Sequence, residues 1–202
     1  MPEPLQPQLH LLRPSLEGLP PVVPPAGYAV RGSRPDEGAV WSRVVADAFN
    51  RTVEQFDFDT KMRSDPSYRP ARILFACHGD EPVAVAAAFH RESFLPDAGM
   101  LHWVAVRPAH RGRRLGYWVS LAALHRMGRD GRRRAWLSTD DFRRPAIRTY
   151  LDLGFEPLLV HANQRARWRA VFAALDRPDA AGRFASILDG PVRHRPDQVR
   201  AP

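Results

Sequence analysis

A short apolar run, a loop rich in arginine and glycine, and a longer apolar run follow one another between residues 100 and 127, and few folds accommodate that order. Residues 100–106 predict a strand that ends at Pro108, because proline cannot donate a hydrogen bond to a neighbouring strand. Residues 115–127 are apolar around most of a helical circumference, which predicts a buried helix. The chain therefore contains a strand, a loop and a helix that packs on a sheet.

The loop between these two elements has the chemistry of an anion site. A loop at a helix N-terminus exposes unpaired backbone N–H groups and the positive end of the helix dipole, and both attract phosphate oxygens. Arg111, Arg113 and Arg114 add side chains that can donate charge-assisted hydrogen bonds. We call residues 107–116 the phosphate loop, and we predict that it binds a ligand carrying a pyrophosphate.

The charge of the chain is concentrated in the same region. The formal net charge is +8, whereas residues 107–148 alone hold twelve arginines against three aspartates, a net charge of +9. Such a concentrated field predicts an anionic partner, either nucleic acid or a phosphorylated small molecule, and composition does not separate the two.

The remaining segments predict a mixed α/β or α+β fold with helices on the faces of a sheet. Residues 71–77 and 83–89 are apolar runs around a turn that contains Gly79, which predicts a hairpin. Ser33 or Asp36 could cap a helix over residues 40–49. Further strands are predicted at residues 27–31, 135–139 and 155–160, and further helices from Pro145 to Gly154 and over residues 164–175.

Proline dominates the beginning of the chain, with nine of the 20 prolines in the first 35 residues. We predict that residues 1–27 form an extended arm, because proline disfavours both helices and central strands. Residues 161–190 are expected to form a helical extension, and residues 191–202 a flexible tail.

The chain is expected to be soluble and cytoplasmic, with no membrane partner. It contains no apolar run near the length of a membrane span, and its first residues lack a basic start followed by an apolar stretch. The single cysteine, Cys77, lies in an apolar run and is expected to be a buried structural thiol.

Two motifs resemble the GNAT acyltransferase superfamily. Arg111, Gly112 and Gly116 match its Arg-x-x-Gly-x-Gly or Ala signature after a strand, while Arg114 stands where the family usually has glycine. The second landmark of the family is matched by Ala146, Ile147, Tyr150, Gly154 and Phe155. The resemblance covers residues 100–156, and the strand order extends it back to Tyr28. It implies a GNAT-like domain over residues 28–160, with a mixed central sheet, splayed strands and flanking helices.

The resemblance implies that acetyl-CoA or another acyl-CoA is the cosubstrate and that no metal is needed. The pantetheine arm would run along the main chain from Val104 to Val106, between splayed strands. The pyrophosphate would bind residues 111–116 of the phosphate loop. The family often has asparagine seven residues before the tyrosine, and Arg143 at that position is expected near the cofactor. CoA then suffices as the anionic partner, so nucleic acid is not expected to bind.

Two residues are candidates for proton transfer. Tyr150 occupies the position where many GNAT enzymes keep the donor that protonates the leaving thiolate; the alternative is a packing residue. His102 lies in a Leu-His-x-x-Ala-Val strand that looks like that of arylalkylamine N-acetyltransferases, where a histidine relays protons. Its alternative is a buried histidine with a structural role.

Carboxylates are candidates for binding a cationic acceptor. Glu54 and Asp57 lie in an acidic and aromatic stretch, residues 52–65, which is either a short helix or a mobile loop. Asp140 and Asp141 follow a strand and either bind an amine or cap the next helix. His161 and Trp168 either close the acceptor site or pack the terminal helix.

The sequence thus predicts an acyl-CoA-dependent N-acyltransferase, with acetyl as the default acyl group, in which an amine attacks the thioester directly. The acceptor is expected to be a small-molecule amine, and the protein a monomer or a homodimer. The alternative is a noncatalytic acyl-CoA-binding or regulatory module on the same fold.

Overall fold

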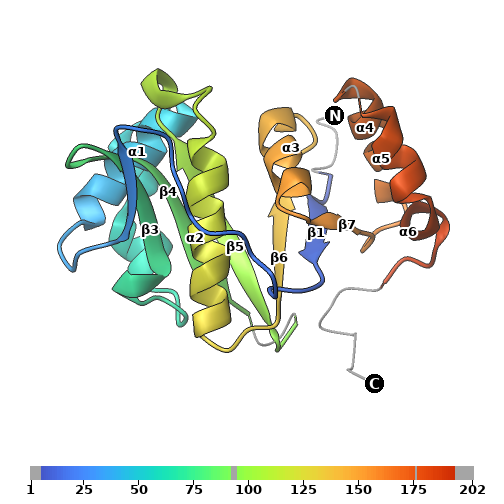
Figure 1. The fold of residues 1–202 in the computed structure, drawn as a ribbon, viewed down its shortest axis with the longest axis horizontal. Coiled ribbons are helices and arrows are strands. Elements are labelled where there is room, and N and C mark those ends of the chain that lie inside the picture. Colours follow the sequence, from blue (N-terminus) through green and yellow to red (C-terminus); the bar gives the residue numbers. More distant parts are fainter. Residues whose placement is uncertain (1–5, 92–94, 176, 194–202) are drawn as a thin grey trace. The chain divides into compact units, whose positions relative to one another are not determined.

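The computed structural model describes residues 6–91, 95–175 and 177–193, which form an α/β fold. Contacts divide the chain into two compact units. The phosphate-loop unit comprises residues 15–91 and 97–135, and the Tyr150 unit comprises the described parts of residues 1–14, 92–96 and 136–202. Figure 1 labels their helices and strands. Every helix in the described ranges is too short or too polar to serve as a transmembrane span.

Four antiparallel strands form the sheet of the phosphate-loop unit, in the order β2-β3-β4-β5. They are β2 (Tyr28–Gly32), β3 (Ile73–His78), β4 (Glu81–His90) and β5 (Ala98–Val106). The predicted hairpin is confirmed as β3 and β4, and Gly79 in its turn has a φ of +57°. Glycine adopts this left-handed conformation without the steric penalty that a Cβ would bring.

Two helices of this unit pack on its strands. α1 (Gly38–Phe49) contacts β4 and β5, and α2 (Leu115–Arg129) contacts β3, β4 and β5 (Figure 1). The predicted buried helix is confirmed as α2, which buries Val119, Leu121 and Leu124. Burial of one such side chain contributes about 1.5–3 kcal/mol, so packing on the sheet stabilises the helix far more than its intrinsic propensity does.

Short helical turns connect these elements. The segment 52–65 forms η1 (Val53–Phe56) and η2 (Asp59–Arg63), while η3 (Pro70–Arg72) leads into β3 and η4 (Pro108–His110) lies in the phosphate loop. The predicted caps of α1 are wrong, since the N-cap residue is Glu37 and makes no side-chain cap hydrogen bond. Its carboxylate instead accepts a hydrogen bond from Nη1 of Arg31 at 2.8 Å.

The Tyr150 unit has strands in the order β6-β1-β7. They are β6 (Arg134–Thr139), β1 (Leu9–Arg13) and β7 (Glu156–Leu158), and β1 and β7 are antiparallel. The first two residues of β6 belong to the phosphate-loop unit. β7 is shorter than the predicted strand 155–160. The helices of this unit are α3 (Arg144–Asp152), α4 (Gln164–Ala174), α5 (Pro178–Arg183) and α6 (Ala185–Asp189).

The structure corrects the prediction that residues 1–27 form an arm without sheet hydrogen bonds. Residues 9–13 form β1, which pairs with β7 and buries Leu9, Leu11 and Leu12. The six residues between Pro7 and Pro14 contain no proline, so every one of them keeps the N–H group that a ladder requires. Residues 1–5 and all but the first three residues of the predicted tail lie outside the described residues. The predicted limits of the main domain, residues 28 and 160, stay predictions.

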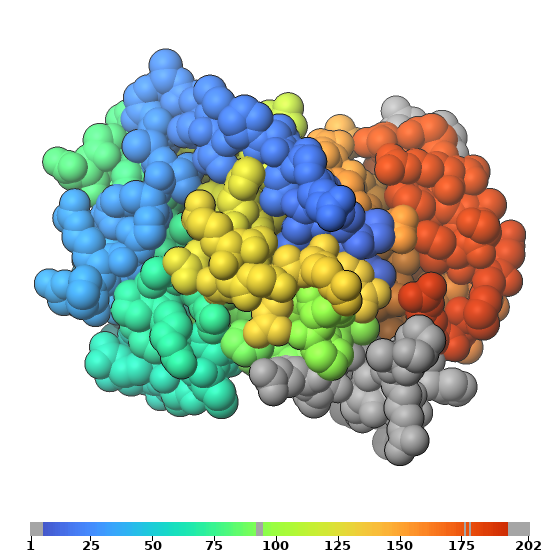
Figure 2. Space-filling model, turned by 60° about the horizontal axis from the view of Figure 1, so that its bottom comes forward, coloured from blue at the N-terminus to red at the C-terminus, as the bar shows by residue number. Residues whose placement is uncertain are grey.

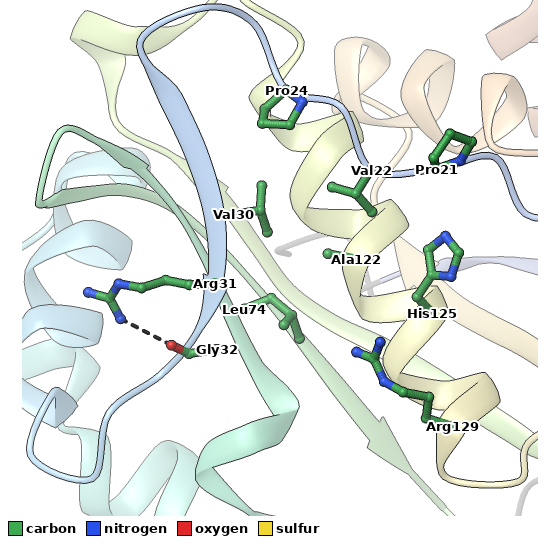
Figure 3. Close-up of a pocket in the computed structure, with 10 residues that line it drawn as sticks. All are labelled: Pro21, Val22, Pro24, Val30, Arg31, Gly32, Leu74, Ala122, His125 and Arg129. Atoms are coloured by element: carbon green, nitrogen blue, oxygen red, sulfur yellow. Dashed lines mark hydrogen bonds between the residues drawn. The ribbon is translucent and has the colours of Figure 1, made fainter.

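Residues 15–27 follow an extended path across α2 within the phosphate-loop unit (Figure 2). His125 donates a hydrogen bond from Nε2 to the carbonyl of Pro20 at 2.8 Å, and the N–H of Leu16 donates to the carbonyl of Arg133 at 2.8 Å. A groove of about 390 Å³ remains between this segment, β2 and α2, and its apolar lining includes Val22 and Val30 (Figure 3). These two bonds attach the proline-rich segment to α2 and to the residues just after it.

Candidate functional site

The phosphate loop joins the end of β5 to the start of α2 in one sharp reversal. Gly112 and Arg114 both have left-handed backbones, with φ of +79° and +56°. α2 then starts at Leu115 without any side-chain cap, and the N–H groups of residues 112–114 donate no backbone hydrogen bond within the described chain. Several N–H groups at this helix N-terminus therefore remain available to an anion.

The left-handed backbone of Arg114 explains why a glycine is usual at this position of the motif. A residue with a Cβ pays about 1–2 kcal/mol for this conformation. The guanidinium of Arg114 lies 4.6 Å from the centre of the Tyr117 ring, a cation–π contact that offsets part of the strain. The departure from the family pattern thus keeps the backbone shape of the loop and adds a cation to it.

Arg111, Arg113 and Arg114 make no ion pair with a carboxylate in the part of the chain that the structure describes. Nη2 of Arg111 donates to the carbonyl of Ala48 at 2.8 Å, and Nη1 of Arg113 donates to the carbonyl of Ala109 at 2.9 Å. Carbonyls orient these cations without neutralising them. The positive charges of these three arginines are therefore not cancelled by acidic groups of the described residues.

Ion pairs neutralise several other arginines of the predicted basic region. Arg107 lies 2.7 Å from a carboxylate oxygen of Asp47. Similar pairs join Arg126 to Asp130, Arg133 and Arg134 to Asp97, and Arg143 to Asp140. The arginines whose charge is left for a ligand thus include those at the N-terminus of α2.

β5 carries a bulge immediately before the phosphate loop. Val85 pairs with Ala105 and Ala87 pairs with His102, so two residues of β5 face the single residue Ala86. One of the two, Trp103, has a φ of +51°. An extra residue at a bulge is left unpaired in the ladder, so this part of β5 offers a backbone N–H to a bound group.

His102 lies beside the bulge and is largely buried. Burial and, to a smaller extent, the cation of Arg91 lower its pKa to about 4, against an opposing effect of the Asp65 carboxylate. The imidazole is therefore neutral near pH 7 and has a free nitrogen lone pair. Its ring centre lies 6.0 Å from that of Phe89 and 5.1 Å from that of Trp103.

Tyr150 belongs to the other unit, on α3, and only 7% of it is exposed. Burial raises the pKa of its phenol to about 12, against an opposing effect of the Arg143 cation. The phenol is thus protonated at any physiological pH. Arg143, the N-cap residue of α3, lies 2.9 Å from a carboxylate oxygen of Asp140.

The structure therefore brings the predicted site residues together in two groups. His102, Val104, Val106 and the phosphate loop belong to the phosphate-loop unit, whereas Tyr150, Arg143 and Asp140 belong to the Tyr150 unit. The meeting of the two groups around one ligand, and the splayed strands expected there, stay predictions.

The model of the Acetyltransferase (GNAT) family matches residues 39–155, more than half of the chain. The chain belongs to the GNAT acetyltransferase family. The match includes α1, the bulged strand β5, the phosphate loop, α2 and α3.

Comparison with individual proteins agrees with this assignment. The chain is 34% identical over 155 residues to a mycothiol acetyltransferase from Thermomonospora curvata. This alignment covers 73% of this chain and 50% of that protein. A mycothiol acetyltransferase from Mycobacteroides abscessus is 32% identical over 162 residues, covering 77% of this chain and 54% of that protein. The chain thus spans about half the length of the curated relatives it matches.

The fold also resembles that of a solved structure, the GCN5-related N-acetyltransferase from Sphaerobacter thermophilus. The two superpose with a TM-score of 0.57 at 23% sequence identity, covering 75% of this chain and 49% of that chain. The α/β architecture predicted from the sequence is the GNAT fold.

The carboxylates predicted to bind the acceptor of this GNAT protein lie around a groove next to α1. Glu54 and Asp57 line a groove of about 370 Å³ together with Asp36 and Asp59, and we call it the acidic groove. Hydrogen bonds from Thr60 lower the pKa of Asp57, with the N–H of Thr60 at 2.8 Å. Asp59 lies in the stretch predicted to bind the acceptor, whereas Asp36 was not predicted there, because only folding brings the loop before α1 next to η1 and η2.

Other predicted residues have structural partners. Neither Asp140 nor Asp141 caps α3, so that alternative is wrong: Asp140 pairs with Arg143, and Asp141 forms an ion pair with Arg167. Trp168 is fully buried and its ring lies 5.5 Å from that of Phe172, so it packs the terminal helix. Cys77 is confirmed as a buried free thiol.

Proposed function

We propose that this GNAT protein is an N-acetyltransferase that uses acetyl-CoA and acts on a small-molecule amine. The observation that carries the proposal is the phosphate loop: an uncapped helix N-terminus with three arginines that have no carboxylate partner among the described residues, directly after a bulged strand. These groups suit a ligand whose pyrophosphate follows a long amide-bearing arm.

Two further features of the loop support this proposal. A Cβ added to Gly116 would meet the Val106 side chain at 3.6 Å, an ordinary contact, so glycine or alanine fits there as the family pattern requires. The N–H groups of residues 112–114 are available to phosphate oxygens, and Arg111 and Arg113 supply charge next to them.

Each remaining requirement of acyl transfer has a candidate group in this chain. Neutral His102 would accept the proton of the attacking amine, directly or through water. A backbone N–H of the bulge would stabilise the negative charge that develops on the carbonyl oxygen. The phenol of Tyr150, protonated because it is buried, would protonate the leaving thiolate.

We further propose that the acidic groove attracts the acceptor. Hydrogen bonds lower the pKa values of Glu54 and Asp57, and the carboxylates of these two residues favour a cationic amine. The matched relatives are named for mycothiol, which makes a mycothiol-type amine the first acceptor to test.

The experiment is thiol release from acetyl-CoA, measured with a panel of amines that includes a mycothiol-type acceptor. The proposal predicts amine-dependent release by the wild-type protein, reduced by Asp57→Asn and little changed by Asp152→Asn, a matched variant on α3 outside the groove. Binding of acetyl-CoA by calorimetry without release to any amine would contradict enzymatic activity and favour the noncatalytic alternative.

A further inference from the structure

Trp103 has a backbone conformation that its side chain does not favour. A φ of +51° is a genuine outlier for a bulky aromatic residue, and such strain clusters at sites where the backbone shape is used. The neighbouring position of the bulge is Val104, and His102 precedes it. The outlier thus lies in the part of β5 to which the proposed function assigns the thioester.

Two aromatic rings hold the indole of Trp103 from outside the strand. The Trp41 ring, on α1, lies 5.2 Å away at an interplanar angle of 84°, and the Phe56 ring, on η1, lies 5.9 Å away at 90°. Trp41 is fully buried, and Phe56 is itself stacked on Phe49 at 5.7 Å. Both contacts are edge-to-face, the geometry that aromatic pairs favour.

Filling of the core does not explain the backbone conformation of this residue. The indole N–H of Trp103 is buried and has no hydrogen-bond partner among the described residues. The indole nitrogen therefore makes no hydrogen bond that would account for the backbone conformation of Trp103. Packing in a strand also does not require a left-handed backbone, since no other residue of β3, β4 or β5 has a positive φ.

We propose that Trp103 is a positioning residue: its indole, clamped between Trp41 and Phe56, fixes the bulge so that a backbone N–H at residues 103–104 faces the thioester carbonyl. This inference rests on the proposed function and deepens it. Trp103 acts through the backbone and need not touch the acceptor. The contact between Phe56 and Trp103 also links η1 to β5, the strand proposed to hold the thioester. η1 carries Glu54, which lines one side of the acidic groove.

The test compares three variants: Trp103→Ala, Trp103→Phe and Phe56→Ala. Trp103→Ala should lower kcat about 10- to 100-fold, the range associated with a misplaced or lost oxyanion donor. Trp103→Phe keeps both edge contacts and should stay within about threefold of wild type. Phe56→Ala removes one side of the clamp without changing β5 and should lower kcat about three- to tenfold.

A second readout separates positioning from general loss of structure. The bulge is proposed to contact the thioester carbonyl, which acetyl-CoA has and CoA lacks. In Trp103→Ala, the affinity for acetyl-CoA should therefore fall relative to the affinity for CoA, and the affinity for CoA should stay unchanged. Phe75→Leu, a substitution of a fully buried ring on β3, serves as the control and should destabilise the fold without changing this ratio.

The outcomes distinguish this inference from the proposed function. Thiol release by the wild type, together with a wild-type kcat and affinity ratio in folded Trp103→Ala, would overturn the role of Trp103. If Trp103→Ala does not fold, an unchanged kcat and ratio in Phe56→Ala would overturn it equally. Absence of thiol release by the wild type with every amine would instead count against the proposed function.

Discussion

Arg91 donates from Nη1 to Oδ1 of Asp65 at 3.0 Å, and this ion pair joins the end of β4 to the segment that follows η2. Asp65 also accepts hydrogen bonds from the N–H and the hydroxyl of Ser67, at 2.9 and 2.6 Å. The pair is therefore a fixed feature of the phosphate-loop unit. Its two charges act in opposite directions on the pKa of His102, after burial, which is the larger cause.

Substitution of either partner should shift the pKa of His102 in a known direction. Arg91→Gln removes a cation and should raise this pKa above its wild-type value of about 4, while Asp65→Asn removes an anion and should lower it. NMR titration of the imidazole measures both. Shifts of the same sign in the two variants would contradict the assignment of these charges.

Burial of neutral His102 should make stability depend on pH. The folded pKa of about 4 lies below the ordinary value of 6.5, so the unfolded chain binds more protons between these values. The free energy of unfolding should be fully retained above pH 6.5 and should fall, by up to about 3 kcal/mol, as the pH decreases to 4. Urea unfolding of wild type and His102→Gln checks this, and the same slope in both would exclude His102 as its source.

Arg114→Gly should not destabilise the protein, unlike most arginine-to-glycine substitutions. Glycine relieves the left-handed strain at this position, which outweighs the lost ring contact with Tyr117 and the flexibility gained by the unfolded chain. We expect a gain of about 0.5 kcal/mol. Arg113→Gly, at a position without a left-handed φ, should lose about 0.5 kcal/mol in the same thermal unfolding experiment.

Tyr150→Phe tests the proposed proton donor. Because the ring packs 6.1 Å from that of Phe155 and the hydroxyl is the only group removed, the fold and the affinity for CoA should be preserved. General acid catalysis contributes about 10²–10⁴-fold, and kcat should fall by at least the lower value. Steady-state thiol release gives kcat, and calorimetry gives the affinity. An unchanged kcat would leave Tyr150 with only its packing role.

Local patterns in the sequence were enough to predict much of the phosphate-loop unit. The hairpin β3–β4 and the helix α2 are specified by apolar runs between turn residues, and the arginine and glycine spacing identified the loop. The bulge at Trp103 left no such signal. It depends on contacts with Trp41 and Phe56, which are 62 and 47 positions earlier in the chain.

Elements whose stability depends on distant partners were predicted less well. β1 was assigned to an arm because its flanking prolines are conspicuous, whereas its partner β7 lies nearly 150 residues later. Asp140 and Asp141 were expected to cap α3 or bind an amine; neither caps α3, and they form ion pairs with Arg143 and Arg167. A sequence pattern gives the side chain but not the partner that folding supplies.

The affinity for CoA tests the central claim, that the phosphate loop binds the pyrophosphate. Arg111→Gln and Arg113→Gln should each weaken CoA binding about 10-fold or more in calorimetry, since each removes a charge-assisted contact. Arg129→Gln, at the other end of α2, should leave it unchanged. Acetylpantetheine, which lacks the pyrophosphate, should react equally well with all four proteins. Wild-type CoA affinity in both loop variants, or an equal loss with acetylpantetheine, would contradict the account.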